Sequence, residues 1–446
     1  MGKEKDTLDF RVTRNEQIRA LVLHPELRRA DLRRAEASNR SAEATLEEAI
    51  GLAQAIELQI VHAEVVAVPR PKPATLLGEG VVQRVHDQVE AESVDLVVVD
   101  TALTPVQQRN LETAWGCKVI DRTGLILEIF GARARTNEGK LQVDLASLSY
   151  QRSRLVRSWT HLERQRGGAG FMGGPGERQL EIDRRLIDEK IVRLKGDLEK
   201  VKRTRELHRS ARKRVPYPIV ALVGYTNAGK STLFNRLTAS DVRAQDLLFA
   251  TLDPTMRRVQ LPSGKEIILS DTVGFISDLP TDLIAAFRAT LEEVTEADVI
   301  VHVRDIVHAD TLAQRDDVLA ILKDLNLEET LENSSLEAWN KADLLDSEGR
   351  TQLEQAGGND GNRVICSAAS GEGCDDLLEA IDRKLAERRS NISTRVALSD
   401  GATLAWLYRH GDVRERHDEG EFAILEVGLE PADAARFERR QAGNGN

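Results

Sequence analysis

Apolar residues follow two different spacings along the first 135 residues of the chain. Short, continuous apolar runs such as 95–100 are typical of buried parallel strands, and the segments between them carry the spacing of amphipathic helices. The pattern predicts strands at 19–23, 60–68, 95–100 and 118–120, and helices at 44–58, at 80–91 and from Thr104-Pro105 onward. We therefore expect a small α/β domain over residues 1–135.

Residues 136–214 carry a stripe of apolar residues at alternating spacings of four and three. The stripe comprises Leu141, Leu145, Leu148, Leu155, Trp159 and Leu162, and then Leu180, Ile187, Ile191, Leu194, Leu198 and Val201. It predicts two helices packed along a coiled-coil-like seam. A glycine-rich stretch, 166–177, lies between them. A first helix of about 22 residues would be roughly 33 Å long, so this tip would stand away from the body.

The third region opens with a strand, a glycine loop and a helix. The apolar run 219–223 leads into a loop with glycines at both ends, and a helical segment follows. Such a loop turns backbone N–H groups toward a phosphate, and the helix N-terminus adds partial positive charge. We expect Lys230 to reach the β- and γ-phosphates and Ser231 to bind Mg²⁺. The loop residues expected to bind nucleotide are Gly224, Tyr225, Thr226, Asn227, Ala228, Gly229, Lys230, Ser231 and Thr232.

A second motif, Asn340-Lys341-Ala342-Asp343, indicates guanine as the base. The Asp343 carboxylate can accept hydrogen bonds from guanine N1–H and the 2-amino group. Adenine has neither donor, so an unpaired carboxylate would cost about 1–3 kcal/mol. The loop Ser367-Ala368-Ala369 is expected to support the base through backbone N–H groups. The substrate is therefore predicted to be GTP, with Mg²⁺.

Two further stretches have the character of the nucleotide-sensing switches. A strand at 267–270 ends at Asp271, which we expect to hold Mg²⁺ through its shell, and the Gly274 N–H would meet the γ-phosphate. The first switch supplies a threonine for the metal, for which both Thr251 and Thr255 qualify chemically. The switch residues expected at the site are Phe249, Ala250, Thr251, Leu252 and Asp253, and Asp271, Thr272, Val273 and Gly274.

Position 275 holds phenylalanine where many GTPases have a glutamine that orients the attacking water. A phenyl ring can neither position nor deprotonate water. We therefore expect slow intrinsic hydrolysis, with the missing group supplied by a rearranged switch or by a partner. Simple packing of Phe275 in the core is compatible with the same conclusion.

The charge distribution separates one segment from the rest. The chain of 446 residues has a net charge of −11, but residues 151–214 contain 19 Lys and Arg against 9 Asp and Glu. That local +10 leaves −21 for the remainder. Concentrated positive charge on the helical hairpin favours contact with RNA, although a spacer with solvated charged faces is the alternative.

Length and composition bound the remaining possibilities. We expect domains at 1–135, 136–214 (helical hairpin with a glycine-rich tip), 215–390 (GTP-binding) and 395–440 (small, charged α/β tail). Three scattered cysteines argue for a reducing compartment, and no apolar stretch approaches the length of a membrane span. We expect a cytoplasmic, monomeric protein that does not insert into membranes. A second nucleotide site at Gly78-Glu-Gly80 is an open alternative to an ordinary turn.

These motifs together resemble the HflX family of bacterial GTPases, of the Obg-HflX class. Besides the nucleotide motifs, the likeness covers 103–111, 119–125 and the stretch ending at 175–177. The resemblance implies an α/β P-loop GTPase domain behind a small α/β domain and a helical arm. It makes Ser231 and Thr251 the Mg²⁺ ligands, and Lys230, Thr251 and Gly274 the residues that act on the phosphate.

The resemblance also implies a partner, the large (50S) ribosomal subunit, with the arm reaching rRNA near the peptidyl-transferase region. Its implied task is to separate or rescue stalled or idle ribosomes. Two positions depart from the family pattern, Arg178 and Arg304, and neither removes a phosphate or base contact. Other readings remain: a ribosome-assembly GTPase, an ATP-driven RNA-remodelling factor, or a signalling G-protein whose arm binds protein.

Overall fold

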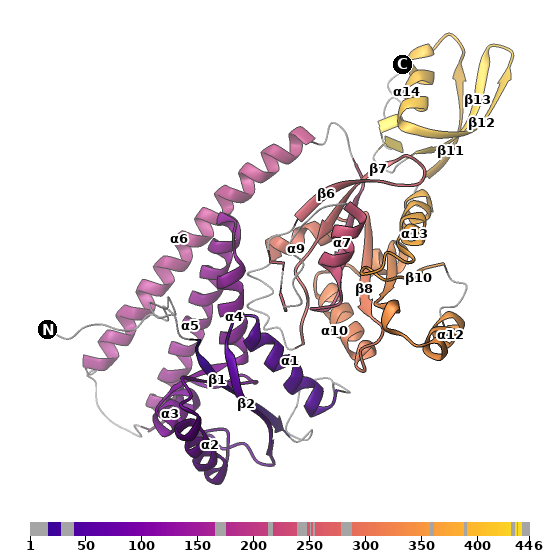
Figure 1. Ribbon diagram of the computed structural model, residues 1–446. Coiled ribbons are helices and arrows are strands. Elements are labelled where there is room, and N and C mark those ends of the chain that lie inside the picture. Colours follow the sequence, from indigo (N-terminus) through magenta and orange to yellow (C-terminus); the bar gives the residue numbers. More distant parts are fainter. Residues whose placement is uncertain are drawn as a thin grey trace.

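The computed structural model describes residues 17–27, 40–165, 175–212, 217–238, 248–249, 251–252, 255–277, 288–356, 361–387, 390–429, 433–434 and 436–438. Figure 1 shows an N-terminal α/β unit, two long helices beside it, a second α/β unit and a small C-terminal unit. The fold class is α/β with a P-loop domain behind a smaller α/β domain and a helical arm, as predicted.

The N-terminal unit is built around a parallel sheet whose strand order, among the described residues, is β2-β1-β3-β4. Alternate residues of β1 face opposite sides of it: Ala20 and Val22 meet α1 and α4, whereas Leu21 and Leu23 meet α2 and α3. Its elements are β1 (Arg19–Leu27), α1 (Ala42–Gln54), β2 (Gln59–Val68), α2 (Glu79–Glu92), β3 (Leu96–Val99), α3 (Pro105–Trp115), β4 (Lys118–Asp121) and α4 (Arg122–Arg133).

Helix α4 has no counterpart in the predicted elements. It follows β4 without a loop, and its first turn is capped by Asp121, whose side chain accepts from the Gly124 N–H. Residues Leu125, Ile126, Leu127, Ile129 and Phe130 are all buried. A helix covered by neighbours on several sides has no polar face. It therefore lacks the alternation of apolar and polar residues, with a period of 3.6, that predicts a helix from sequence.

Two long helices, α5 (Asn137–Gln165) and α6 (Pro175–Arg212), form the arm and pack against each other. With 29 residues, α5 is longer than the 22 expected, because it begins before the first stripe residue and continues past the last. Ile191 of α6 is buried, and Ile187, Leu194 and Leu198 are half-buried. Residues 166–174 of the glycine-rich stretch lie outside the described residues.

The second α/β unit contains a mixed sheet of strand order β10-β9-β8-β5-β7-β6 in the described part of the chain, with β6 antiparallel to β7. Helices α7 and α13 cover one face, and α9 and α10 cover the other. The strands are β5 (Ile219–Val223), β6 (Thr255–Gln260), β7 (Glu266–Asp271), β8 (Val299–Asp305), β9 (Ser335–Asn340) and β10 (Arg363–Ile365). The helices are α7 (Lys230–Thr238), α9 (Arg288–Thr295), α10 (Thr311–Asp324), α11 (Glu328–Asn333), η2 (Ala342–Leu344), α12 (Ser347–Ala356) and α13 (Cys374–Glu387).

The C-terminal unit has a core of its own. Its described strands are antiparallel in the order β11-β13-β12, and α14 packs on them. Val396, Leu407, Leu425 and Phe437 belong to this core, and the ring of Trp406 stacks on that of Phe437. The elements are β11 (Ser390–Ala397), α14 (Gly401–His410), β12 (Gly411–Glu419) and β13 (Phe422–Leu429).

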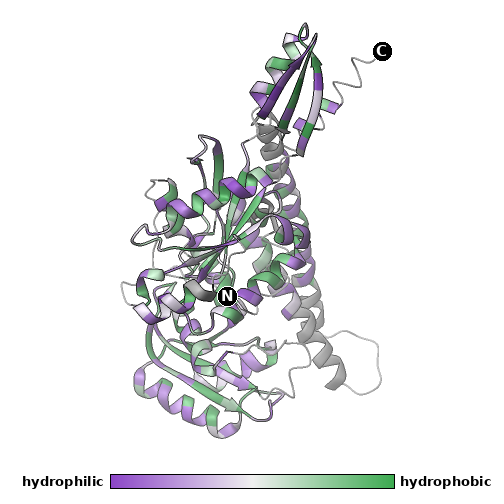
Figure 2. Ribbon diagram, turned by 90° about the vertical axis from the view of Figure 1, so that its right-hand side faces the viewer, coloured by the Kyte–Doolittle hydropathy of each residue, from purple (hydrophilic) through white to green (hydrophobic). Residues whose placement is uncertain are grey.

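The N-terminal and P-loop units share one continuous hydrophobic core. It runs from α1 and α4 on one side to Phe249, Phe275 and Ile276 on the other. The rings of Phe130 and Phe249 meet edge to face, with 4.8 Å between their centroids. In the two larger α/β units, Figure 2 shows hydrophobic residues gathered on the strands and hydrophilic ones on the outer faces of the helices. Of the helices within the described ranges, none is both long and apolar enough to cross a bilayer.

Candidate nucleotide-binding site

The loop between β5 and α7 has the backbone of a phosphate cradle. Gly224 has φ +151° and Gly229 has φ +91°, conformations that a side chain would strain. A Cβ on Gly224 would lie 2.2 Å from the Val303 carbonyl oxygen, and one on Gly229 would lie 2.2 Å from the Asn340 amide nitrogen. Both glycines are therefore required by close packing as well as by backbone geometry.

Lys230 begins α7 and is buried beneath this loop. Its ammonium donates to the carbonyl oxygens of Gly224 (3.1 Å) and Tyr225 (2.8 Å). Burial lowers the pKa of Lys230 to about 8, although the nearby Asp271 carboxylate raises it. A phosphate beside this nitrogen would favour the charged form of the lysine.

Three oxygen-bearing side chains meet beside the cradle. Asp271 Oδ2 accepts from Ser231 Oγ at 2.7 Å and from Thr251 Oγ1 at 2.9 Å, and the two hydroxyl oxygens are 2.9 Å apart. These are hard oxygen donors of the kind Mg²⁺ prefers. Asp271 Oδ1 is buried and finds no hydrogen-bond partner in the described part of the chain, and burial raises the pKa of this carboxyl. A divalent cation would give Asp271 Oδ1 a partner and would favour the charged form of the carboxyl. The residues therefore fit the metal.

The alternative threonine, Thr255, meets Asp271 through the strand pairing and not through its side chain. It is the first residue of β6 and pairs with Asp271 across the antiparallel ladder. Thr251, by contrast, reaches the Asp271 carboxylate with its hydroxyl. The geometry therefore favours Thr251 over Thr255.

The second switch is bound to the phosphate loop through its backbone. The Thr226 N–H donates to the Phe275 carbonyl at 2.7 Å, and the Phe275 N–H donates to the Gly224 carbonyl at 3.1 Å. Gly274 lies so close that an added Cβ would be 3.0 Å from Thr226 Cα and 3.1 Å from Lys230 Nζ. The Phe275 ring is buried in the core shared with the N-terminal unit. It thus packs rather than facing the phosphates.

The residues predicted to bind guanine gather at the carboxyl end of β9. Asn340 is buried and joins two loops: its Nδ2 donates to the Ala228 carbonyl at 2.8 Å, and its Oδ1 accepts from the Ala368 N–H at 2.9 Å. Ser367 Oγ donates to Asp343 Oδ1 at 2.6 Å. Asp343 is exposed, as a carboxylate that meets a ligand at a rim would be. Lys341 pairs with Asp305 at 2.7 Å.

Most of the predicted site residues are brought together, and a few stand apart. Thr232 and Ala369 are exposed, while Thr272 is buried and donates to the Leu222 carbonyl at 2.6 Å. Ala250 and Asp253 lie outside the described residues. The remaining residues surround the cradle, the metal oxygens or the base-side loop.

Sequence reasoning missed a set of residues from the N-terminal unit that touch the site. Glu48 of α1 accepts from the Tyr225 hydroxyl, and Arg122 of α4 donates to the Ser277 carbonyl at 3.1 Å. The sequence contained one signal, a large aromatic residue with a hydroxyl inside the phosphate loop. No spacing rule connects it to α1 or α4.

A parallel strand, a glycine cradle with a buried lysine, a Ser-Thr-Asp oxygen cluster and an Asn-Lys-x-Asp loop define a P-loop GTPase. Models of protein families match the chain in four stretches: GTP-binding GTPase N-terminal (43–131), GTP-binding GTPase middle region (133–212), 50S ribosome-binding GTPase (219–341) and HflX C-terminal domain (352–446).

The chain is 49% identical to the GTPase HflX of Magnetococcus marinus over 88% of this chain and 90% of that protein. It is 46% identical to the GTPase HflX of Escherichia coli, over 76% and 78% of the two chains. The protein belongs to the HflX family of GTPases, and it hydrolyses GTP. A crystal structure titled as an SsGBP and GDP complex is also similar, with 22% identity, TM-score 0.46 and coverage of 82% and 98%; this likeness is too partial to bear on domain arrangement.

Proposed function

We propose that this GTPase binds the large (50S) ribosomal subunit and uses GTP binding and hydrolysis to separate or rescue stalled or idle ribosomes. The observation that carries the proposal is a nucleotide site whose two switches are packed, within one core, against the domain that bears the basic arm. The family model described as a 50S ribosome-binding GTPase, which matches 219–341, supports the ribosome as partner.

In this proposal the phosphate end of the site acts through Lys230, Gly274 and Thr251. The Lys230 ammonium and the N–H groups of the loop hold the phosphates, and the Gly274 N–H meets the γ-phosphate. Ser231 and Thr251 would hold Mg²⁺, with the Asp271 carboxylate behind them, and a bound metal would supply charge neutralisation at the phosphate oxygens. Support comes from the 2.7–2.9 Å separations among these oxygens and from the unpaired, buried Asp271 Oδ1.

At the base end, Asp343 reads guanine and the loop 367–369 supports the ring. The Ser367 hydroxyl orients the Asp343 carboxylate through the 2.6 Å hydrogen bond. Asn340 holds this loop against the phosphate loop, so that base and phosphates are recognised by one connected structure.

The arm supplies the contact with RNA. Arg154 of α5 still contacts Leu103 and Gln108 of the N-terminal unit, and the helical residues 155–165 extend α5 by about 16 Å past that contact. The surplus of 10 positive charges in 151–214 would attract rRNA, and the attraction would weaken as salt rises. Nucleotide binding at the switches would then favour the subunit-bound conformation, and hydrolysis would release it.

Sedimentation with purified 50S subunits tests the proposal. We expect association with Mg²⁺ and a non-hydrolysable GTP analogue to be stronger than with GDP, and to weaken with added salt. Association that ignores both the nucleotide and the salt would refute it. Splitting of 70S ribosomes in the same assay distinguishes a recycling factor from a ribosome-assembly GTPase, which would act on immature subunits instead.

Paired variants of exposed residues on α6 provide the control. Arg193 and Lys195 are exposed on α6, as are Glu189 and Glu199. We expect Arg193→Ala with Lys195→Ala to weaken 50S binding, and Glu189→Ala with Glu199→Ala to leave it equal or stronger. If both double variants lost 50S binding equally, the effect would come from a change in the helix and not from the removal of positive charge.

A further inference from the structure

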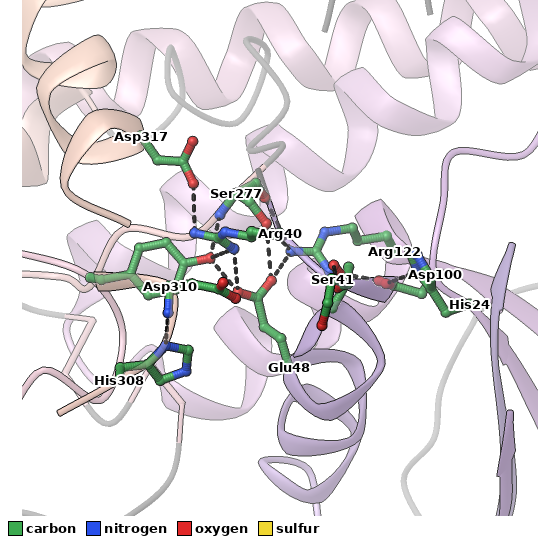
Figure 3. A network of polar contacts seen from close by, with 12 residues as sticks. His24, Arg40, Ser41, Glu48, Asp100, Arg122, Ser277, His308, Asp310 and Asp317 are labelled. Atoms are coloured by element: carbon green, nitrogen blue, oxygen red, sulfur yellow. Dashed lines mark hydrogen bonds and ion pairs between the residues drawn. The ribbon is translucent and has the colours of Figure 1, made fainter. Parts of the chain in front are cut away.

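The phosphate-loop tyrosine is held by the N-terminal unit. Tyr225 is buried, and its hydroxyl donates to Glu48 and accepts from the Ser277 N–H at 2.9 Å and from Arg40 Nη1 at 2.8 Å. Figure 3 shows Glu48 between Arg40 and Arg122, with Ser277 beside it. Three parts of the chain far apart in sequence therefore meet at one phenol oxygen.

Ser277, at the end of the second switch, is bound through its backbone as well as its side chain. Its N–H donates to Tyr225, its carbonyl accepts from Arg122 at 3.1 Å, and its hydroxyl donates to Glu48 at 3.0 Å. Gly274 lies three residues earlier, against Lys230. A displacement of Gly274 that carried Ser277 along would break all three hydrogen bonds.

The network is buried and its charges are matched. The side chains of Arg40, Arg122 and Glu48 are 5%, 6% and 10% exposed. Arg122 also donates to Asp100 at 2.6 Å, and Arg40 donates to Asp317 at 2.7 Å. Burial alone would lower the pKa of Arg122, but Asp100 and Glu48 raise it above its usual value. Burial and Glu48 raise the pKa of Tyr225, which therefore stays a neutral donor.

The first switch is held by the same two helices. Phe249 packs edge to face on Phe130 of α4. Leu248 lies over Gly51 of α1, where an added Cβ would be 3.1 Å from its Cδ1. Two residues beyond Phe249, Thr251 meets Ser231 and Asp271, the side chains proposed above to hold the metal. Both switches are thus in contact with α1 and α4 in this structure.

We infer that Glu48 and Arg122 are positioning residues for the GTP site, which hold Tyr225 and Ser277 so that the closed switches, and with them the triphosphate, are favoured over the diphosphate. The inference rests on the nucleotide roles proposed above. The diphosphate makes no γ-phosphate contact with Gly274, so its binding does not depend on where the second switch lies. The N-terminal unit thereby contributes to the preference for GTP over GDP.

Equilibrium binding to the full-length protein tests this with Glu48→Gln. The matched control is Glu64→Gln, since Glu64 pairs with Arg84 at 2.6 Å inside the same unit and has no part in the network. With Mg²⁺ present, we expect Glu48→Gln to weaken a non-hydrolysable GTP analogue by about tenfold while GDP changes by less than about twofold. The control should alter neither. Equal weakening of both nucleotides by Glu48→Gln would overturn the inference.

Hydrogen exchange supplies a readout independent of turnover. The Ser277 N–H is bonded to Tyr225 in the wild-type protein, so its exchange should be slow, and it should accelerate in Glu48→Gln. Ser277→Ala, which removes only the hydroxyl contacts, should shift the nucleotide preference in the same direction by a smaller factor. It also keeps the inference testable if Glu48→Gln does not fold. Failure of the wild-type protein to bind either nucleotide would instead refute the proposed site.

Discussion

Lys230 shows how burial of one side chain links nucleotide binding to pH. Its pKa of about 8 means that the free protein carries a neutral lysine increasingly above that pH. The charged form is the one that a triphosphate stabilises. Binding should therefore raise the pKa and take up a proton in the window above about pH 8.

Calorimetry in two buffers of different ionisation enthalpy measures this uptake. We expect a fraction of a proton to be absorbed on binding of the GTP analogue at about pH 8.5 and almost none at about pH 6.5, where the lysine is already charged. Affinity should fall by at most about tenfold per pH unit above the pKa. Proton release at the higher pH, or none in either direction, would contradict the lowered pKa.

Asp343 concerns the base rather than the phosphates. Asp343→Asn replaces an acceptor with an amide donor, which suits the 2-oxo group of xanthine. We expect GTP to bind about 5- to 150-fold more weakly, equivalent to about 1–3 kcal/mol, and XTP to bind more tightly. Asp346→Asn is the control, because Asp346 is in the same loop and accepts the Gly349 N–H at 2.8 Å. If Asp343→Asn left the affinity for GTP unchanged, Asp343 would not be the residue that recognises guanine.

Arg304, one of the departures from the family pattern, is explained by its neighbour in the sheet. It lies on β8, is buried, and donates to Glu337 of β9 at 2.8 Å. Burial tends to raise the pKa of Glu337, but Trp339 and Arg304 lower it to about 2. The arginine is accommodated because a carboxylate on the next strand neutralises it, and it does not reach the phosphate loop.

At the scale of elements, one buried carboxylate joins the arm to the N-terminal sheet. Asp121 caps α4 through the Gly124 N–H at 2.8 Å and accepts from the Leu103 N–H at 3.2 Å. From α5 it also accepts the Tyr150 hydroxyl at 2.7 Å and Arg154 Nη1 at 3.2 Å. The orientation of the arm therefore depends on the same side chain that begins α4.

We expect Asp121→Ala to destabilise the N-terminal unit by about 3–5 kcal/mol, because it uncaps a helix and leaves Arg154 without its carboxylate. Asp121→Asn, which keeps the cap, should cost clearly less. Urea unfolding followed by hydrogen exchange of the α4 amides measures the change. Asp95→Ala, which removes an exposed contact to the Arg19 N–H, is the control, and a similar loss there would argue against the special role of Asp121.

At the scale of the whole molecule, residues of both switches share one hydrophobic core with the N-terminal unit. Phe275 stands where a water-orienting residue is common, and its ring is part of that core. The P-loop unit is therefore folded without a group at this position that can orient water. Any such group must come from a rearrangement of the switch or from outside the chain.

Phosphate release measured with and without ribosomal subunits tests this. We expect slow turnover of the protein alone and stimulation by 50S subunits of at least about tenfold, with 30S subunits as the control. Phe275→Gln should not restore fast turnover, because it removes a buried ring from the core rather than adding a side chain that faces the phosphates. A free protein that already turns over at the stimulated rate would contradict the argument.

The strands of the N-terminal unit, the strands β5 and β7, the hairpin arm and the glycine loop between β5 and α7 could be predicted because each depends on neighbouring residues. A short, continuously apolar run such as 219–223 is typical of a buried strand. The glycines at 224 and 229 are required by the positive φ angles of the loop. Helix α4 was not predictable in this way, since its burial on several sides removes its period. The length of α5 was underestimated because the apolar stripe marks only the packed part of a helix.

The amino-acid sequence by itself therefore determined the nucleotide chemistry: a cradle, a lysine, a hydroxyl and a carboxylate at spacings that short-range backbone geometry requires. Only the tertiary structure decided which residues of the N-terminal unit meet that site. Tyr225 and Glu48 are 177 positions apart, and Ser277 and Glu48 are 229 apart. Pairing over such distances follows from the packing of two sheets and their helices, because side-chain identity alone does not say which buried charges will meet.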